Sequence, residues 1–585
     1  MPFIPRVIIR DEKAGQWLSF SGLRQSFCLS RVSDIIPALE RIEKAVCDEG
    51  LWAAGWISYE ASPAFDGAYV THASGEFPMM WMALFGTCEP VDLNLALRVE
   101  KNNSMRDVNW LPSISLPDYH QKIAQIKNQL SEGNSYQVNY TFRQAADLPI
   151  TAEQAFSEFA TNARYGAFIE TEHFSLCSAS PELFFEKNGS RICCRPMKGT
   201  APRGRYLEED LALKDELAQS EKNRAENLMI TDMIRNDLGK IADIGSVEVT
   251  RPFAIEKYPT VWQMTSTVSA DCHANLVGIF SALFPCASIT GAPKANTMKI
   301  IRQLEPEPRK IYTGTIGFIR PDMSMQFNVA IRTLLLDKST NRAEYGVGGG
   351  IVWDSDAESE YQECMIKTRV LAGTSDDSHS LLETLLWTPA EGYFLLDYHL
   401  RRLKQSALYF DYHFDENQVN ASLAKIIAQA KMPQRVRLTM DKVGSVQATC
   451  QDFVTRDPAQ PYRLILSDKP VDEQNIYYYH KTTERRCYDY FARLYPDYDD
   501  VLLQNSRGEI TESLIANLII ESAGKFYTPS RQCGLLAGTY RQHLLDTGYM
   551  TEKIISIDDL EKADKIYLAN SVRKIWPVQL EFVRF

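Results

Sequence analysis

The spacing of apolar residues along the chain changes between the period of a helix and that of a strand. Ile123, Ile126 and Leu130 lie three or four residues apart, as on one face of a helix, and a Gly-Asn pair follows them. The stretch YQVNYT (136–141) then alternates between the two faces expected of a strand. The same reasoning predicts helices at residues 33–49, 118–132, 206–238, 360–367 and 399–410, and strands at 312–317, 327–336 and 345–351.

A short polar stretch divides this pattern in two. Residues 372–380 (AGTSDDSHS) are small or polar, which is typical of a linker. Beyond them, strand, helix, strand and helix are followed by strand–turn–strand units, and no repeat relates the two halves. We therefore expect two unrelated domains, at residues 1–372 and 381–585, joined by a linker at residues 373–380.

Length and composition agree with this division. With 585 residues the chain is too long for one hydrophobic core. Its net charge of −12, without a block of basic residues, argues against nucleic acid or an anionic membrane as a partner. No apolar run is long enough to span a bilayer, and no basic-then-apolar leader begins the chain. Twelve scattered cysteines without a CxxC pair are typical of reduced thiols, which predicts a cytoplasmic protein.

The first candidate for chemistry is Lys198, in the stretch RPMKGTAPRG (195–204). It follows an apolar run and precedes a Gly-Thr turn, so we expect its amine at the end of a strand. Most lysines in such places are simply solvated. A lysine that is held neutral in a pocket can instead attack an electrophilic carbon. The stretch alone does not decide between these two interpretations.

A second group of charged residues points to an anion and a cation. Glu360, Glu363 and Lys367 are spaced to share one helix face, which is also the spacing of an exposed ion pair. Glu226 lies on another predicted helix, and carboxylates from distant helices repel one another unless a cation such as Mg²⁺ joins them. Arg332 lies among alternating apolar residues of a predicted strand, and an inward-facing arginine there needs an anion.

Eight motifs in this half resemble those of chorismate-utilising enzymes in content and order, over residues 115–372. They are SPELF, PMKGTAPRG, AENLMITDMIRNDLGKI, SITGAPK, YTGTIGF, FNVAIRT, GVGGGIVWDSD and EYQECMIK. Anthranilate synthases carry alanine in place of Lys198, and the salicylate and isochorismate branch carries a lysine base in place of Gln137. The resemblance is therefore to the aminodeoxychorismate synthase component I branch. Where the family often has a histidine this chain has Gln263, which cannot shuttle a proton at neutral pH.

This resemblance implies an α+β fold of two packed antiparallel sheets flanked by helices, and a set of roles. Glu182 would be the general acid that aids loss of the C4 hydroxyl, and Lys198 would attack C2 of chorismate before ammonia enters at C4. Glu226 and Glu363 would hold Mg²⁺, with Glu360 nearby. The implied substrate-binding residues are Arg332, Tyr312, Gly349, Lys367, Thr290, Gly291 and Thr200.

The second half has its own candidate lysine. Lys481 follows the aromatic run YYYH, which alone predicts a strand end with an exposed lysine. Downstream, Glu512 is flanked by strand residues, where it would face and stabilise a protonated pyridinium nitrogen. Gly538 and Thr539 form a glycine turn that opens a helix, a place that suits a phosphate. Arg402, in HLRRL, is a further candidate for binding that phosphate.

The motifs HLRRL, HKTTER, GEITESLIANL, GLLAGTYR and LANSVR resemble fold-type IV pyridoxal-phosphate enzymes of α/β fold, specifically aminodeoxychorismate lyase, over residues 380–585. The resemblance implies that Lys481 is the Schiff-base lysine and that Arg402, Glu512, Gly538 and Thr539 bind the cofactor. The usual N-terminal lead-in of this family is missing. Branched-chain and D-amino-acid aminotransferases share the fold, so the lyase assignment depends partly on the neighbouring domain.

Together the two resemblances predict a bifunctional enzyme of p-aminobenzoate (folate) synthesis that uses Mg²⁺ and pyridoxal 5′-phosphate. Chorismate and ammonia would give 4-amino-4-deoxychorismate, and loss of pyruvate would leave p-aminobenzoate. No glutaminase motif is visible, so we expect a separate glutamine amidotransferase subunit to supply ammonia. A dimer formed through the second domain is one candidate assembly. Two alternatives stay open: an anthranilate synthase-like enzyme with an aminotransferase-like tail, and a fusion whose C-terminal domain is not catalytic.

Overall fold

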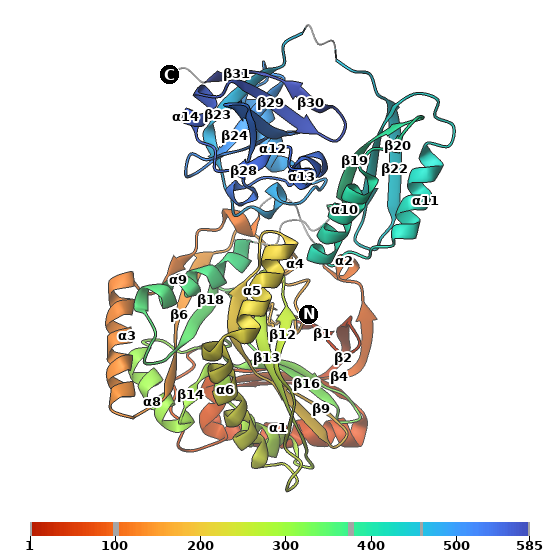
Figure 1. Cartoon of the computed structure of the whole chain (residues 1–585). Helices are drawn as coiled ribbons and strands as arrows, with labels where there is room; N and C mark the ends of the chain where they lie inside the picture. The colour runs from red at the N-terminus through yellow and green to blue at the C-terminus, as the bar shows by residue number, and fades with distance from the viewer. Residues whose placement is uncertain (1–2, 98–103, 373–378, 457–459, 583–585) are drawn as a thin grey trace. The chain divides into compact units, whose positions relative to one another are not determined.

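The computed structural model describes residues 3–97, 104–372, 379–456 and 460–582. The chain forms two compact units, drawn in Figure 1. Unit 1 comprises Met1–Ala201 and Glu216–Ser375, and unit 2 comprises Pro202–Asp215 and Asp376–Phe585. The linker predicted at residues 373–380 lies, up to residue 378, outside the described residues.

Strands dominate unit 1, and hydrogen bonds join them into an 18-stranded network that is largely antiparallel. The strands are β1 Arg6–Asp11, β2 Gln16–Leu29, β3 Trp52–Ile57, β4 Met80–Val91, β5 Leu111–Pro112, β6 Gln137–Asp147, β7 Ala167–Glu170, β8 Phe174–Ser178, β9 Leu183–Asn188, β10 Arg191–Arg195, β11 Met197–Pro202, β12 Glu248–Lys257, β13 Val261–Asp271, β14 Gly291–Ala292, β15 Thr315–Ile319, β16 Met325–Val329, β17 Thr333–Asp337 and β18 Arg342–Ile351. The helices are α1 Val32–Glu49, α2 Leu93–Ala96, α3 Leu116–Ser131, α4 Ala152–Phe159, α6 Glu221–Gly239, α7 Leu276–Leu283, α8 Lys294–Leu304 and α9 Ala357–Thr368. Helix α5 Leu207–Gln219 has residues assigned to both units.

The core of unit 1 has separate layers. One apolar cluster is built from strands, among them β1, β2, β3, β4 and β15, and includes Trp56, Trp81 and Phe318. Two others add helices, α1 and α7 in one cluster and α3, α4 and α9 in the other. Strand faces therefore pack on one another on one side and on helices on the other, and the predicted α+β class is confirmed.

Local sequence signals explain the helices that position the site. The Ser115 hydroxyl accepts a hydrogen bond from the Asp118 N–H and caps α3, whose Ile123 and Ile126 are buried as their spacing predicts. The Asp356 side chain caps α9 in the same way. Helix α6 packs on β13 (Figure 1). The single helix predicted at residues 206–238 is wrong, because Ser220 accepts from the Asn223 N–H and starts α6 as a new helix after α5.

Unit 2 has two sheets. The first has the order β20-β19-β21-β22, and the second has nine strands. The strands are β19 Leu381–Thr388, β20 Gly392–Tyr393, β21 Gln434–Met440, β22 Val446–Asp452, β23 Arg463–Val471, β24 Asp500–Asn505, β25 Ile510–Ser513, β26 Asn517–Ser522, β27 Lys525–Pro529, β28 Thr551–Lys553, β29 Lys565–Asn570, β30 Lys574–Pro577 and β31 Gln579–Phe582. The helices are α10 Leu396–Phe410, α11 Glu416–Ile426, α12 Arg486–Leu494, α13 Thr539–Asp546 and α14 Ile557–Glu561.

Helices α10 and α11 cover one face of the four-stranded sheet, where Leu385, Val436 and Leu438 meet Leu403 and Leu423 in an apolar cluster. The nine-stranded sheet mixes parallel pairs, such as β23 with β24, with antiparallel ones. The predicted α/β class of this unit is confirmed. No helix among the described residues is long and apolar enough to cross a membrane.

Candidate active sites

Lys198 lies on β11, opposite a glycine of β18. A Cβ atom added to Gly350 would lie 2.6 Å from Lys198 Nζ and 2.7 Å from Gln137 Nε2. Gly350 pairs with Asn139 on β6, the strand that also carries Gln137, so three strands bring the amine and the amide together. Gln137 is fully buried, and within the described part of the chain neither amide atom has a hydrogen-bond partner. A buried amide without a partner is costly, so this side chain is available for a ligand beside Lys198.

Glu182 is the second group of this site and lies just before β9. Its side chain is buried, and the Ser288 hydroxyl donates a hydrogen bond of 2.8 Å to Glu182 Oε1. Burial raises the pKa of Glu182 to about 7, although the Ser288 hydrogen bond and the positive charge of Lys198 act in the opposite direction. A carboxyl group of this pKa holds its proton near neutral pH and can donate it.

We expect Glu182→Gln to separate activity from stability. If the sequence prediction of chorismate as the substrate is right, its amination should fall by about 10²-fold or more, because glutamine cannot protonate a leaving hydroxide. In the wild type kcat/KM should fall as pH rises above about 7, where Glu182 loses its proton. Steady-state kinetics over pH would check both results, and a variant with unchanged kcat/KM would contradict the assignment of Glu182 as the acid.

The stability part of this prediction has a definite sign. Because the folded pKa of Glu182 is raised, the native state keeps a proton that the unfolded chain releases. The contribution of Glu182 to the stability of the fold is therefore lost between pH 4.5 and about 7. Above that window, Glu182→Gln should therefore stabilise the fold by up to roughly 3 kcal/mol. Urea unfolding at pH 4 and pH 8 would show a variant advantage only at the higher pH.

The charged residues predicted to share one face of α9 make hydrogen bonds and an ion pair in the structure. Lys367 Nζ lies 2.8 Å from Glu363 Oε1 and donates to the Gly348 carbonyl at 2.9 Å. The Ser355 hydroxyl donates to Glu360 Oε1, and Glu360 Oε2 lies 3.0 Å from a Cβ built on Gly349. Lys367 lowers the pKa of Glu363, whereas burial raises that of Glu360. The positive charge of Lys198 acts on both carboxylates, which places this face at the same site.

The metal ligands predicted from sequence are carboxylates, the donor type that Mg²⁺ prefers. Glu226 is half-buried on α6, and Lys222, one turn earlier, also acts on the pKa of Glu363, so this end of α6 lies near α9. In the described residues, no group of three or more His, Cys, Asp or Glu side chains is close enough to hold a metal. The donor chemistry fits an ion that is bound by one or two carboxylates together with water and substrate oxygens.

Arg332 is not on a strand, contrary to the prediction. The predicted strand 327–336 breaks between β16 and β17, and Arg332 lies at a bend with φ of 49°. The reason is a tight turn in which the Ile331 N–H donates to the Val329 carbonyl and the Arg332 carbonyl accepts from the Ala179 N–H. Arg332 and Tyr312 both influence the pKa of Tyr345, so these side chains lie together.

The remaining residues predicted for this site shape the backbone around Gln137 and Lys198. Gly291 has φ of 134°, and a Cβ there would lie 2.0 Å from the Gln137 carbonyl, so this position requires glycine. Thr290, before it, is buried and donates to the Cys286 carbonyl. The Thr200 hydroxyl donates to Gln263 Oε1 at 2.9 Å, and Gln263 Nε2 donates to the Gly199 carbonyl at 2.8 Å. Gln263 therefore positions the segment around Lys198.

Asn227 was not predicted from sequence. Its Nδ2 donates to the Lys198 carbonyl at 3.1 Å and to the Met264 carbonyl at 3.3 Å, and Ser266 donates to its Oδ1. It thus ties α6 to both β11 and β13. Its position directly after Glu226 in the AENLM motif was the available signal.

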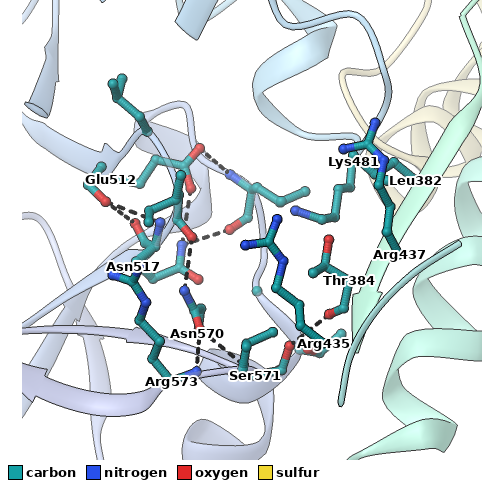
Figure 2. Close-up of a pocket in the computed structure, with 18 of the residues that line it drawn as sticks. Leu382, Thr384, Arg435, Arg437, Lys481, Glu512, Asn517, Asn570, Ser571 and Arg573 are labelled. Carbon is teal, nitrogen blue, oxygen red and sulfur yellow. Dashed lines mark hydrogen bonds between the residues drawn. The ribbon is translucent and has the colours of Figure 1, made fainter. Parts of the chain in front are cut away.

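Unit 2 contains a pocket of about 950 Å³ that brings together the cofactor residues predicted from sequence (Figure 2). The residues are Lys481, Arg402, Glu512, Gly538 and Thr539. Lys481 does not end a strand as predicted, because the aromatic run before it forms a 3₁₀ helix at Ile476–Tyr478. Burial, followed by the charge of Arg402, lowers the pKa of Lys481 to about 8, which increases its neutral fraction.

Glu512 lies on β25 and is buried in this pocket. Its Oε1 accepts from the Tyr488 hydroxyl at 2.7 Å and from the Leu536 N–H at 3.0 Å, and its Oε2 accepts from Asn517 Nδ2 at 3.2 Å. Burial raises its pKa to about 8. A cationic ring nitrogen beside it would favour the charged carboxylate, so the two would stabilise each other.

Arg402 is held by Glu383, which His399 contacts in turn, and the sequence revealed neither partner. Its guanidinium donates to both oxygens of Glu383, at 2.9 and 2.6 Å, and His399 Nδ1 lies 2.6 Å from Glu383 Oε2. Although burial acts to raise it, the pKa of Glu383 is lowered to about 2 by Arg402 and His399. The Thr539 hydroxyl lies 3.3 Å from His399 Nε2, so contacts within hydrogen-bonding distance connect Arg402 to Thr539 through Glu383 and His399.

The start of α13 fits a phosphate group. Gly538 is the N-cap residue and has no side chain to cover the helix N–H groups, and a Cβ there would lie 2.1 Å from Asn517 Oδ1. Arg402, whose Nη1 lies 3.5 Å from the Ala537 carbonyl, adds positive charge next to this turn. A helix N-terminus with a neighbouring arginine binds phosphate favourably. The residues present therefore fit pyridoxal phosphate.

Comparisons with known proteins agree with this division into two sites. Residues 6–373 match the family model of the chorismate binding enzyme, and residues 380–580 match that of amino-transferase class IV. Aminodeoxychorismate synthase component 1 of Klebsiella aerogenes is 40% identical over 262 residues, 44% of this chain and 58% of that protein. The protein of the same name from Bacillus subtilis is 39% identical over 253 residues, 43% of this chain and 53% of that protein.

The chain thus spans a little over half the length of these curated relatives. A crystal structure of anthranilate synthase component I from Streptococcus pneumoniae covers 64% of this chain and 91% of its own, with a TM-score of 0.51 and 21% identity, which is a likeness of fold. The family match extends over more than half of the residues. The chain therefore belongs to the chorismate binding enzyme family.

Proposed function

We propose that this protein is a bifunctional enzyme that converts chorismate and ammonia into p-aminobenzoate in two steps. Unit 1 aminates chorismate to 4-amino-4-deoxychorismate, and unit 2 removes pyruvate from that product. The observation that carries the proposal is Lys198, whose amine lies beside an unpartnered amide, Gln137, and whose positive charge acts on a buried acid, Glu182.

The amination is a substitution in two stages. The Lys198 amine forms a bond to C2 of chorismate while Glu182 protonates the C4 hydroxyl, which leaves as water. Ammonia then forms a bond at C4, and the bond from C2 to Lys198 breaks. A covalent adduct divides one difficult displacement into two easier ones. Over both stages chorismate and ammonia give 4-amino-4-deoxychorismate and water.

We propose Mg²⁺ as the cofactor of unit 1. Glu226 and Glu363, with Glu360 nearby, would hold the ion, which would neutralise a ring carboxylate of the dianionic substrate. Arg332 and Lys367 would bind carboxylates, and Tyr312, Thr290, Gly291, Thr200 and Gly349 would line the pocket. Lys367 forms an ion pair with Glu363, so it would bind a substrate carboxylate while it remains paired with Glu363.

In unit 2, the residues of the pocket fit pyridoxal phosphate, which would act as an electron sink that acidifies the C4–H bond of aminodeoxychorismate. Arg402, Gly538 and Thr539 would hold its phosphate, and Glu512 its ring nitrogen. The lowered pKa of Lys481 suits a base that takes the C4 proton. The C3–O bond then breaks, the enol leaves as pyruvate, and the ring becomes aromatic.

Further partners follow from the chemistry and from the relatives. Both curated relatives are named component 1 of aminodeoxychorismate synthase, which supports a separate glutamine amidotransferase subunit as the source of ammonia. The acidic net charge supports neither nucleic acid nor membrane as a partner. We place the protein in the cytoplasm, which is supported by twelve cysteines that all are free thiols. Dimerisation through unit 2 belongs to the same proposal.

Product analysis tests this function directly. The enzyme with chorismate, ammonium, Mg²⁺ and pyridoxal phosphate should form p-aminobenzoate and pyruvate in equal amounts, measured by chromatography and a coupled pyruvate assay. The ortho isomer, anthranilate, would instead show the alternative with an aminotransferase-like tail. Accumulation of aminodeoxychorismate alone would show that unit 2 is not catalytic.

A further inference from the structure

Strand β21 gives one wall of the unit 2 pocket two arginines. Val436 and Leu438 face the apolar cluster beneath α10 and α11, so by the alternation of a strand Arg435 and Arg437 face the other way. Both line the pocket, together with Thr384, which pairs with Arg437 across the sheet. Figure 2 shows these residues on the side of the pocket opposite Glu512 and Asn517.

These two arginines differ from the others around the pocket in having no carboxylate, carbonyl or aromatic partner among the described residues. Within the described residues, neither guanidinium makes an ion pair or a hydrogen bond to the protein. The other four arginines that line the pocket are engaged: Arg402 with Glu383, Arg456 with Asp499, Arg485 with the Leu514 carbonyl, and Arg573 with the rings of Tyr462 and Trp576.

Two like charges on one strand face repel each other unless an anion lies between or upon them. Residues i and i+2 of a strand are roughly 6.5 Å apart. The cofactor phosphate does not supply this anion in the proposed arrangement, because its place is at Gly538, beside Asn517 on the opposite wall. The pair therefore remains free for an anionic substrate.

We propose that Arg435 and Arg437 together bind the two carboxylates of a dicarboxylate amine and so select it over monocarboxylate amino compounds. The inference rests on the proposed lyase function, whose substrate carries carboxylates on substituents in a 1,3 relation around its ring. Guanidinium groups bind carboxylates through paired hydrogen bonds. One of the two carboxylates leaves with pyruvate, so p-aminobenzoate is held by one contact fewer and is released more easily.

The test compares the holoenzyme with Arg435→Gln, Arg437→Gln and the double variant. Isophthalate, an inert 1,3-dicarboxylate, and benzoate serve as probes, and calorimetry gives their Kd values. The wild type should bind isophthalate about tenfold or more tightly than benzoate, and the double variant should bind both equally. The KM for aminodeoxychorismate should rise about 10- to 100-fold in the double variant, with kcat changed by less than about threefold.

Two controls separate recognition from damage. Arg437→Lys keeps the charge but not the planar fork, and should recover part of the lost affinity. Arg493→Gln removes an exposed arginine of α12 outside the pocket and should change nothing. Circular dichroism and cofactor absorbance confirm that each variant is folded and loaded.

The outcomes distinguish this inference from the function on which it rests. A wild type that forms no p-aminobenzoate from aminodeoxychorismate would refute the lyase function. The Kd values for isophthalate and benzoate would still test whether Arg435 and Arg437 bind a dicarboxylate. A wild type with lyase activity, together with a folded double variant that keeps its KM and its preference for isophthalate, would overturn the role of Arg435 and Arg437.

Discussion

Replacement of Lys198 by alanine should abolish amination of chorismate, by at least about 10³-fold in kcat, and leave the lyase reaction intact. Without the amine no covalent adduct can form at C2, so ammonia must displace a poor leaving group in one step. The loss should appear in kcat rather than in KM, because in the proposed mechanism Lys198 acts on the transition state and not on the carboxylates. Separate assays with chorismate and with supplied aminodeoxychorismate measure the two halves.

Two further variants make this result specific. Lys198→Arg keeps the positive charge beside Glu182 and Glu360 but cannot act as a neutral nucleophile at neutral pH, and should be equally inactive. Lys13→Ala removes an exposed lysine after β1 and should retain full activity. Substantial amination by folded Lys198→Arg would mean that Lys198 contributes charge only, and the covalent route would have to be abandoned.

Replacement of Lys481 by alanine should stop p-aminobenzoate formation, again by about 10³-fold or more, and should let aminodeoxychorismate accumulate. Lys481 combines a lowered pKa with a place in the pocket beside Arg402 and Glu512, which suits the proposed base. Mass spectrometry of the products over time measures the accumulation. Borohydride treatment, which fixes the cofactor to its lysine, should label the wild type but not the variant.

Lys469→Ala is the matched control for this second lysine, because Lys469 is exposed on β23. It should keep wild-type turnover and cofactor labelling. If Lys481→Ala still releases pyruvate at a rate near that of the wild type, the base lies elsewhere in the pocket. If both lysine variants stop both reactions, the two sites depend on one another and the assignment of separate roles fails.

Part of each site was predictable from sequence because neighbouring residues determine it. The turn at Gly538 and Thr539, the strand around Glu512 and the shared face of Glu360, Glu363 and Lys367 are all local patterns. Local signals failed where contacts between distant segments decide the backbone. The bend at Arg332 overrides an alternating pattern that indicated a strand, and the 3₁₀ turn before Lys481 overrides an aromatic run that indicated a strand end.

The sequence by itself indicated two families of motifs, one in each half of the chain, and the two lysines that these motifs surround. Only the tertiary structure decided which residues meet. Gly350 of β18 faces Lys198 of β11, Glu383 of β19 holds Arg402 of α10, and Pro202–Asp215 belongs to the second unit. The physical reason is that periodicity and caps depend on residues a few positions apart, whereas a site forms from side chains that long-range strand pairing brings within hydrogen-bonding distance.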